Sequence, residues 1–374
     1  MKLKSALTQV LQRAWQKKGV LSTLLLPLSW LVRLEVTRRR KQFRLHPERI
    51  THSTKPVIIV GNVFVGGTGK TPVVMALIQA LQARGWQPGV ISRGYGVKPD
   101  ARPLAGQGSL DPKKFGDEPA LISALTKVPV AVHPKRALAL QRLEKAYPQV
   151  DVIIADDGLQ HLALGRDIEI VVQDDRGVGN GRLLPAGPLR EPADRLDTVD
   201  FIITTTLTDG ERPTGSHQLP GHSSAMTLQP THLEKLDDGT LLDWGSWLST
   251  HGRSNCTALA GIGNPQRFFT MLKLQGVTLQ APQALPDHYG FETSPFLNLK
   301  QQIILITAKD AVKCRRWPDP RVWAVHVQPV FSDPAWLDTC HQMLLRIAER
   351  KNTAFKARAD QSVSDPASDK QRRR

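Results

Sequence analysis

The sequence predicts an α/β protein, and three observations lead to this class. After residue 50, short apolar runs alternate with stretches of helical periodicity, as in a mostly parallel sheet covered by helices. A glycine-rich turn directly follows the first apolar run and opens a helix, as in P-loop nucleotide-binding proteins. The alternation starts again after residue 250. We therefore expect a P-loop NTPase-like lobe with a parallel sheet and a second, smaller α/β lobe, joined by a β-hairpin linker.

The first lobe is expected to span residues 51–222. It begins with a short, fully apolar strand at 57–60. Apolar residues then recur at helical spacing from Val74 to Leu81, and Gly85 ends this helix. Further strands are expected at 128–132, 152–155, 168–172 and 201–205, and helices around 118–126 and 136–146.

A linker and a second lobe follow the first lobe. Segment 223–250 carries a turn signal, Asp238-Gly239, between β-prone stretches, so we expect it to form the hairpin linker. The second lobe is expected at 251–349. Its strands are expected at 257–261, 303–307 and 322–327, and its helices at 265–275 and 335–349. The tail at 350–374 is basic, polar and expected to be disordered.

The charge of the chain is concentrated at its two ends. The net charge is +16, of which residues 1–50 carry +10 and residues 350–374 carry +5, so the body between them is almost neutral. This distribution argues against a nucleic-acid-binding protein, whose folded surface would be basic throughout. The three cysteines lie far apart in the sequence, without the spacing of a zinc site or a disulfide framework, which favours a reducing compartment.

The N-terminal segment 1–50 is expected to associate with a membrane. Its longest uncharged run, 19–32, has 14 residues and contains Pro27, so it is too short to span a bilayer. A basic flank at 38–44 follows this run, and Trp15 and Trp30 lie nearby. These features suit a helix lying in an anionic membrane interface; the alternative is an amphipathic helix packed on its own domain. An upstream apolar stripe at helical spacing comprises Leu3, Ala6, Leu7, Val10, Leu11 and Ala14.

The glycine-rich turn, GNVFVGGTGKTP at 61–72, is the strongest functional motif. Backbone N–H groups of such a loop, together with the N-terminus of the following helix, bind phosphate. Lys70 is expected to reach the β- and γ-phosphates of a nucleoside triphosphate, and Thr71 to hold Mg²⁺. The motif departs from the usual pattern, because Phe64 occupies the position of its first glycine; a purely structural turn is the alternative. The expected nucleotide-binding residues are Gly66, Gly67, Thr68, Gly69, Lys70, Thr71 and Pro72.

Acidic residues that could complete the site follow or precede predicted elements. Asp156 and Asp157 come just after an apolar strand, where P-loop proteins place the carboxylate that organises Mg²⁺, although Asp157 could instead cap a helix. Asp117 and Glu118 precede Pro119 at the start of a helix, so they could serve as a base and a metal ligand or could only favour the helix dipole. His288 follows Asp287 in the second lobe, and a lone histidine of this kind is more often structural than catalytic.

Eight motifs occur in an order that resembles a known family, the tetraacyldisaccharide 4'-kinases, which are the lipid A 4'-kinases of Gram-negative bacteria. The resemblance covers roughly residues 5–345. The motifs are GNVFVGGTGKTP (61–72), SRGYG (92–96), GDEPALI (116–122), DDGLQH (156–161), GNGRLLPAGPLREP (179–192), AGIGNPQRFF (260–269), PDHYGF (286–291) and TAKDAVK (307–313).

The resemblance implies an activity and a location. The enzyme would transfer the γ-phosphate of ATP to the 4'-hydroxyl of a tetraacylated glucosamine disaccharide 1-phosphate, giving lipid IVA. Its N-terminal helix would rest on the cytoplasmic face of the inner membrane. We expect a monomer that binds ATP, Mg²⁺ and this acylated lipid, and no nucleic acid.

The resemblance also implies roles for individual residues. Asp117 and His288 would form a catalytic base dyad that joins the two lobes, acting with Lys70. Mg²⁺ would be held by Thr71, Glu118 and Asp156. Asp157, Gln160 and Arg93 are further candidates; Arg93 could contact the lipid 1-phosphate or the triphosphate, or could lie in a surface turn.

Two departures from the family pattern are visible. Ala308 stands where the family usually has Glu, so contacts with the nucleotide base are expected from the remaining Lys309 and Asp310. Leu159 replaces a common aromatic residue. A membrane-associated P-loop switch or partitioning ATPase is a competing hypothesis, but it leaves the Asp-His pair unexplained.

Overall fold

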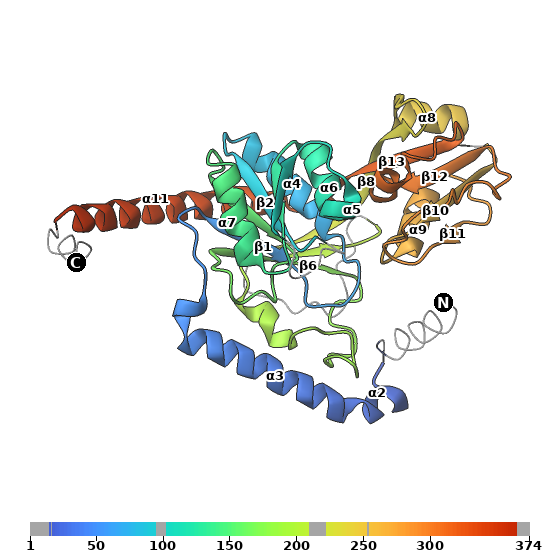
Figure 1. The fold of residues 1–374 in the computed structure, drawn as a ribbon. Helices are drawn as coiled ribbons and strands as arrows, with labels where there is room; N and C mark the ends of the chain where they lie inside the picture. Colours follow the sequence, from blue (N-terminus) through green and yellow to red (C-terminus); the bar gives the residue numbers. More distant parts are fainter. Residues whose placement is uncertain (1–14, 16, 95–101, 209–221, 253, 365–374) are drawn as a thin grey trace.

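A computed structural model describes residue 15 and residues 17–94, 102–208, 222–252 and 254–364 of the chain. Over these residues, thirteen strands form one continuous twisted sheet in the order β11-β10-β12-β13-β8-β7-β6-β1-β5-β2-β4-β3, with β9 paired to β8. Figure 1 shows helices on both faces of this sheet, with the smaller lobe at one end.

The P-loop lobe contains a mostly parallel sheet. Every residue of β1 is buried, and successive side chains point to opposite faces: Ile58 packs with helix α4, whereas Ile59 packs with helix α7. The strands are β1 (Val57–Gly61), β2 (Pro88–Ser92), β3 (Leu104–Gln107), β4 (Pro129–Val132), β5 (Val152–Asp156), β6 (Ile168–Asp174) and β7 (Phe201–Thr205), and β3 pairs antiparallel with β4. The helices are α4 (Lys70–Gln82), α5 (Pro112–Phe115), α6 (Asp117–Thr126) and α7 (Arg136–Ala146), with the short η2 (Ala193–Thr198). The predicted strands and helices of this lobe are all present.

The second lobe repeats the same principle on a smaller scale. Aromatic residues of α8 and α9 pack on one face of its strands, while Phe291 and Phe296 pack on the other. Its elements are α8 (Trp244–His251), β10 (Cys256–Ala260), α9 (Pro265–Leu274), β11 (Gln283–Ala284), β12 (Ile303–Thr307), α10 (Ala308–Cys314) and β13 (Val322–Phe331).

The lobes are connected through strand β8 (His222–Lys235). Its first residues pair in parallel with β7 of the P-loop lobe, and its length from Met226 to Lys235 pairs antiparallel with β13 of the second lobe. The predicted hairpin is present, because β8 also pairs with β9 (Leu241–Asp243) across a turn in which Gly239 has φ of 74°. The pairing with β13, which was not predicted, makes the connection a part of the sheet.

The N-terminal helices lie at the edge of the molecule, away from the sheet (Figure 1). They are α2 (Val20–Leu24) and α3 (Leu26–Leu45), followed by the short η1 (Pro47–Arg49). Their polarity is inverted, since the buried residues are Ser22 and Ser29, whereas Leu24 is 71% exposed and Trp30 is 66% exposed. The apolar stripe expected over Leu3–Ala14 lies outside the described residues. Among the helices that the structure describes, none has the length and apolar composition needed to cross a bilayer.

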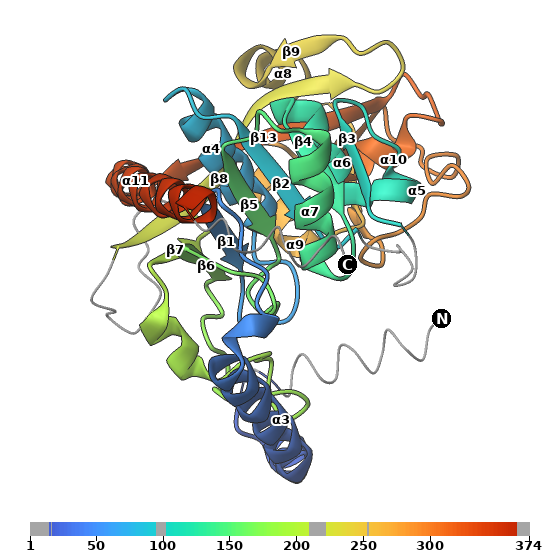
Figure 2. The same ribbon diagram turned by 60° about the vertical axis from the view of Figure 1, so that its left-hand side comes forward.

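The C-terminal helix corrects one expectation. Helix α11 (Ala335–Ser364) has 30 residues in total. It does not end near residue 349 but runs on to residue 364 and projects from the body (Figures 1 and 2). Residues 350–364, expected to be disordered, are helical; the stretch contains several Ala, Lys and Arg residues and no Gly or Pro. Residues 365–374 lie outside the described part.

The described contacts of α11 with the body end near Lys351, whose Nζ lies 2.7 Å from a carboxylate oxygen of Asp167. Trp336, in contrast, is 1% exposed and packs against Phe201 and Phe331. We therefore expect removal of residues 354–374 to leave the free energy of unfolding almost unchanged. Trp336→Ala should lower it by about 3–5 kcal/mol. Chemical denaturation of both variants tests this, and a truncation as damaging as Trp336→Ala would contradict it.

Candidate active site at the junction of the lobes

The P-loop connects the end of β1 to the start of α4. Gly69, just before Lys70, has φ of 88°, and a Cβ atom there would lie 2.9 Å from Thr205 Oγ1, so only glycine fits. Asn62 Nδ2 donates to Gly66 O and to Thr68 Oγ1, both at 3.3 Å, which fixes the loop from inside. These internal contacts therefore help to fix the shape of the loop.

The unusual Phe64 has a structural role in this loop. Its side chain is 5% exposed, it forms a β-bridge with Leu189, and the Arg176 guanidinium lies 4.2 Å from its ring centroid. This residue anchors the first half of the loop to a neighbouring segment, so the absent glycine does not disrupt the loop.

Lys70 and Asp157 form an ion pair at the N-terminus of α4. Lys70 Nζ lies 3.4 Å from Asp157 Oδ1, and Arg190 Nη1 lies 3.2 Å from the same oxygen. Burial acts to raise the pKa of Asp157, but the charges of Lys70, Arg190 and Arg136 outweigh it and lower this pKa to about 2. No helix begins at Asp157, so the alternative that it caps a helix is wrong.

Asp156 is the buried carboxylate at the end of β5, with 1% exposure. Its Oδ2 accepts a hydrogen bond of 3.2 Å from Ser92 Oγ, whereas its Oδ1 has no partner within the described part of the chain. Burial, followed by the negative charge of Glu118, raises the pKa of Asp156 to about 7. The charges of Lys70 and Arg136 oppose this rise only in part, and within the described residues Asp156 forms no ion pair, so a bound cation would stabilise its ionised form.

Glu118 faces the same region from the first turn of α6. Lys309 Nζ of the second lobe lies 2.8 Å from Glu118 Oε1. Burial acts to raise the pKa of Glu118, but the charges of Lys309 and Lys70 hold it below its usual range. Glu118 is therefore ionised and joins the two lobes by a charge pair.

The predicted pair of Asp117 and His288 is brought together across the lobes. His288 Nδ1 lies 3.2 Å from Asp117 Oδ2, and Lys313 Nζ lies 3.1 Å from the same oxygen. Burial acts to raise the pKa of Asp117, but the hydrogen bond with His288 and the charge of Lys313 lower it. His288 has φ of 56°, a strained value for a histidine, so its position is imposed by its surroundings.

A cavity of about 220 Å³ lies between the P-loop and the second lobe. At this junction the two lobes approach closely, since a Cβ atom on Gly263 would lie 2.7 Å from Gly67 N. The lining combines the P-loop with an apolar wall and a few polar groups. Among its residues are Lys70, Thr71, Pro72, Glu118, Leu121, Ile262, Asn264, Arg267, Phe268, Ala308 and Lys309. This shape and chemistry suit a nucleotide, with its phosphates on the loop.

The remaining predicted residues have different positions. Gln160 does not line the cavity but donates to Asn62 O at 3.0 Å, behind the P-loop. Arg93 is exposed and lies two residues before a gap in the described residues. Asp310 is fully buried and accepts hydrogen bonds from Thr307 Oγ1 and Gly261 N, so it supports its own lobe, whereas Lys309 faces the cavity.

Two charged residues of the site were not singled out from the sequence. Lys313 pairs with Asp117, and Arg190 pairs with Asp157. Both lie in motifs that were noted as a whole, TAKDAVK and GNGRLLPAGPLREP, but nothing in their spacing pointed to these partners.

Comparison with known proteins decides the family. A model of the family described as tetraacyldisaccharide-1-P 4'-kinase matches residues 21–345. The chain belongs to this family. A tetraacyldisaccharide 4'-kinase of Bordetella petrii is 50% identical over 350 residues, which cover 93% of this chain and 99% of that protein. Another, from Herminiimonas arsenicoxydans, is 42% identical over 340 residues, covering 88% and 94%.

A solved structure supports the same assignment. It is the crystal structure of the "apo" form of LpxK from Aquifex aeolicus in complex with ATP, with a TM-score of 0.71 and 28% identity. The alignment covers 88% of this chain and 99% of that chain. The predicted fold and the resemblance to the tetraacyldisaccharide 4'-kinases are therefore confirmed, and the chain is a kinase.

The opposite pKa shifts of Asp156 and Asp157 generate a prediction. The folded state holds the Asp156 proton more tightly than the unfolded state, so Asp156 makes stability fall as pH rises from about 4 to about 7. We expect Asp156→Asn to raise the Tm of the ligand-free enzyme at pH 8, by roughly 2 °C or more, and less so at pH 5. Calorimetry in EDTA at both pH values measures this.

Asp157→Asn is the matched control for this prediction. Folding lowers the pKa of Asp157, so the ionised carboxylate stabilises the folded state at every pH above the unfolded-state pKa. Replacing Asp157 by Asn should therefore lower the Tm at pH 8. Two substitutions that shift the Tm in the same direction at pH 8 would contradict the charge distribution described here.

Proposed function

We propose that this kinase binds the triphosphate of ATP on residues 66–72 and phosphorylates an acylated disaccharide whose 4'-hydroxyl reaches the Asp117–His288 dyad. The substrate is a tetraacyl glucosamine disaccharide 1-phosphate and the product is lipid IVA, in lipid A biosynthesis. The observation that carries this proposal is the 3.2 Å contact between Asp117 and His288, beside a cavity that the P-loop lines.

The triphosphate is held by fixed positive groups. Backbone N–H groups at 66–71 and the N-terminus of α4 face the phosphates, and Lys70 neutralises the β- and γ-phosphates. Asn264 and Arg267, at the start of α9, line the cavity from the second lobe. Because phosphoryl transfer needs positioning and charge neutralisation more than covalent chemistry, these groups carry most of the catalysis.

The donor set fits Mg²⁺. Asp156, with its unpartnered buried oxygen, and Glu118 are carboxylates of the kind that bind it, and Thr71 follows the P-loop lysine. Within the described residues no three Asp, Glu, His or Cys side chains converge as a complete metal site. Mg²⁺ in kinases commonly uses one or two carboxylates together with substrate phosphates. When bound, Mg²⁺ supplies charge neutralisation at the β- and γ-phosphates.

The dyad receives the proton of the attacking hydroxyl. The hydrogen bond with His288 and the charge of Lys313 lower the pKa of Asp117, which makes this carboxylate alone a weak base. His288 Nδ1 lies within hydrogen-bond reach of Asp117 Oδ2, so a proton accepted at Asp117 can be shared with the imidazole. The two residues come from different lobes, and the base therefore depends on the lobes being closed on each other.

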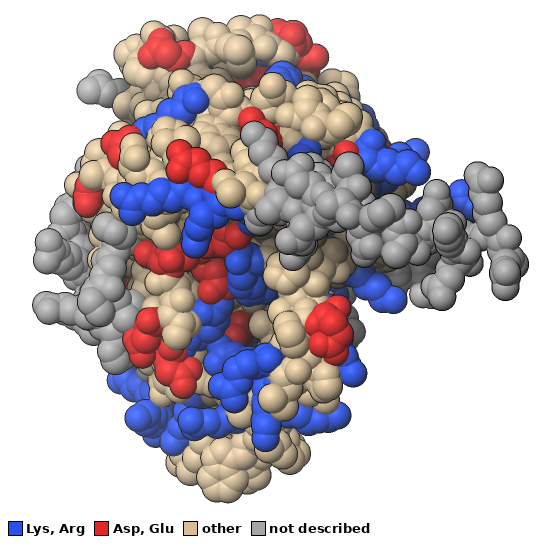
Figure 3. Space-filling model, turned by 90° about the vertical axis from the view of Figure 1, so that its left-hand side faces the viewer, with Lys and Arg blue, Asp and Glu red and all other residues tan. Residues whose placement is uncertain are grey.

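We further propose that α2 and α3 lie on the cytoplasmic face of the inner membrane. Leu28, Trp30, Leu31 and Leu34 are all more than half exposed along α3, which suits insertion into a bilayer interface. Figure 3 shows Lys and Arg side chains gathered toward the end of the molecule where α3 lies, above an uncharged tip. A multiply acylated substrate stays in the bilayer, so the enzyme must come to it. Since one chain supplies every residue of the site, we retain the monomer.

If Asp117 and His288 act as the base, substitutions in this pair should slow phosphoryl transfer without weakening ATP binding. Asp117→Asn and His288→Asn should each lower kcat by about 10²–10⁴-fold while the Kd for ATP stays within a few-fold. Transfer of label from ATP to a lipid A precursor gives kcat, and calorimetric titration gives the Kd. Glu292→Gln, an exposed residue of the same segment, is the control. Unchanged turnover in both dyad variants would remove this pair from the chemistry.

The exposed apolar face of the N-terminal helices predicts membrane binding. The triple variant Leu24→Ser, Trp30→Ser, Leu31→Ser should lower the affinity for anionic vesicles by at least about 10-fold and keep its fold, because these side chains face outward. Vesicle sedimentation measures the affinity, and the Kd for ATP should not change. The control replaces three exposed leucines of the second lobe, Leu241, Leu274 and Leu297, by Ser. Equal loss in both triple variants would argue against the proposed membrane face.

A further inference from the structure

Helices α2 and α3 are docked on the segment 180–195 by hydroxyl groups. Ser22 Oγ donates to Ala186 O at 2.5 Å, and Ser29 Oγ donates to Leu183 O at 2.8 Å. Ala186 N donates in turn to Ser29 Oγ at 3.0 Å. Specific hydrogen bonds therefore attach the helices to this segment, so a shift of the helices would also shift the segment.

The same segment is bound to the P-loop on its other side. Val65 N donates to Pro188 O at 2.9 Å, and Arg190 N donates to Val63 O at 2.7 Å. These bonds flank the bridge between Phe64 and Leu189. Segment 180–195 is thus bonded on one side to the membrane-facing helices and on the other to the phosphate-binding loop.

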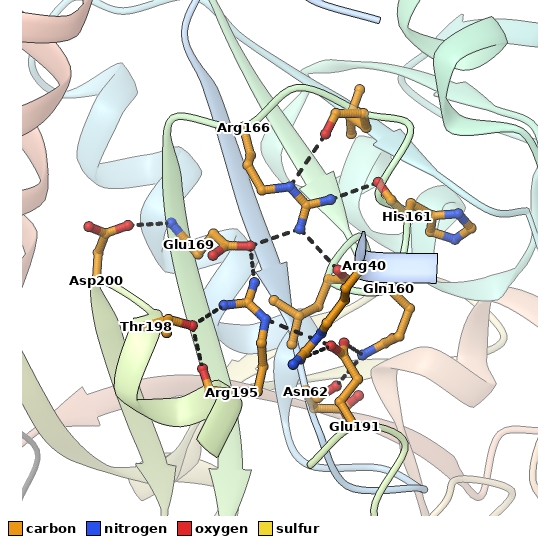
Figure 4. Close-up of polar contacts among 12 residues, drawn as sticks. Arg40, Asn62, Gln160, His161, Arg166, Glu169, Glu191, Arg195, Thr198 and Asp200 are labelled. Carbon is orange, nitrogen blue, oxygen red and sulfur yellow. Dashed lines mark hydrogen bonds and ion pairs between the residues drawn. The ribbon is translucent and has the colours of Figure 1, made fainter. Parts of the chain in front are cut away.

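An ion pair also joins α3 to segment 180–195. Arg40 Nη2 lies 2.5 Å from Glu191 Oε2, and Glu191 is only 3% exposed. The other carboxylate oxygen of Glu191 accepts a hydrogen bond of 2.9 Å from Gln160 Nε2, which also donates to Asn62 O. Figure 4 shows these four residues converging. Asn62 is the residue that holds the P-loop from inside.

The contacts continue from Gln160 to Lys70. Arg190 Nη1 donates to Gln160 Oε1 at 3.4 Å and to Asp157 Oδ1 at 3.2 Å. Asp157 Oδ1 is also 3.4 Å from Lys70 Nζ. An unbroken series of polar contacts therefore leads from Arg40 on α3, through Glu191, Gln160, Arg190 and Asp157, to the lysine of the P-loop.

Arg40 is the main positive partner of Glu191. Arg195 is the other nearby cation, but its Nε lies 3.8 Å from Glu191, and its remaining nitrogens pair closely with Glu169 and Thr198 (Figure 4). A buried carboxylate that loses its close partner must find another positive group or hydrogen-bond donor. Arg195 is already held by its other contacts, and Gln160 already donates to the second oxygen of Glu191. A shift of Gln160 toward the unpaired oxygen would disturb its contact with Arg190 on the P-loop side.

We propose that Arg40 is a positioning residue for phosphoryl transfer: by neutralising Glu191 it keeps Gln160 and Arg190 in place, and through them Asp157 and Lys70. The seating of α3 on the lipid surface is thereby coupled to the geometry of the phosphate site. This inference rests on the proposed roles of Lys70 and α3.

The test compares two neutralised arginines on the same helix. Arg40→Gln and the exposed Arg39→Gln each remove one positive charge from α3. Arg40 pairs with the buried Glu191 whereas Arg39 faces solvent, so vesicle binding should weaken no more in Arg40→Gln than in Arg39→Gln. At saturating ATP and lipid in mixed micelles, Arg40→Gln should lower kcat by about 10-fold, because misplaced groups in the site reduce turnover, while Arg39→Gln retains kcat. Arg40→Lys, which keeps the charge, should restore most of kcat. If Arg40→Gln does not fold, combining it with Glu191→Gln should restore folding, because no unpaired buried charge then remains, and failure of that double variant to fold would contradict the neutralising role of Arg40.

A double-mutant cycle with Glu191→Gln supplies the second readout. If Arg40 acts through Glu191, the double variant should lose no more kcat than the more affected single variant. Equal kcat in Arg40→Gln and Arg39→Gln, or effects that multiply in the cycle, would overturn the proposal. Lys70→Met is measured alongside to separate this outcome from failure of the proposed function. An active Lys70→Met enzyme would contradict the proposed role of Lys70 in binding the triphosphate.

Discussion

The charge balance around Lys70 is the constraint on which the rest of the site depends. Four carboxylates, from Asp117, Glu118, Asp156 and Asp157, approach one region from the ends of separate elements, and such a cluster is unfavourable unless cations divide it. Lys313, Lys309 and Arg190 each neutralise one carboxylate, and Lys70 pairs with Asp157. Among these four carboxylates, Asp156 has a buried oxygen without a partner within the described residues, and this observation supports the proposed Mg²⁺ position.

The sheet explains why these charges come from two lobes. Parallel strands place their carboxyl ends at one edge, so the P-loop after β1, Asp156 at the end of β5 and Ser92 at the end of β2 meet there. The long antiparallel pairing of β8 with β13 extends the sheet into the second lobe and sets that lobe against α6. Lys309, Lys313 and His288 can then reach Glu118 and Asp117. The connection between the lobes is thus made of hydrogen-bonded strands.

Local patterns in the sequence predicted most elements but few of the contacts between them. Apolar runs identified most strands but missed β2, β3 and β11, which are short or contain Gly, Pro or polar residues. Glycines with Lys70 identified the phosphate loop, because these signals lie within a dozen neighbouring residues. Asp117 and His288 are 171 positions apart, and only the resemblance to a family linked them. Arg40 and Glu191 are 151 positions apart, and no local signal separates Arg40 from the other cations of its basic cluster. The extent of α11 was missed because its polar composition, which suits disorder, equally suits an exposed helix.

The inverted polarity of α2 and α3 affects how the protein behaves outside the cell. Helices that turn their serines inward and their leucines and tryptophan outward expose an apolar surface to the buffer. In detergent-free solution, these exposed surfaces of different copies of the enzyme would pack against one another. Aggregates seen during purification would then reflect contacts between these exposed surfaces and would carry no information about quaternary structure in the cell.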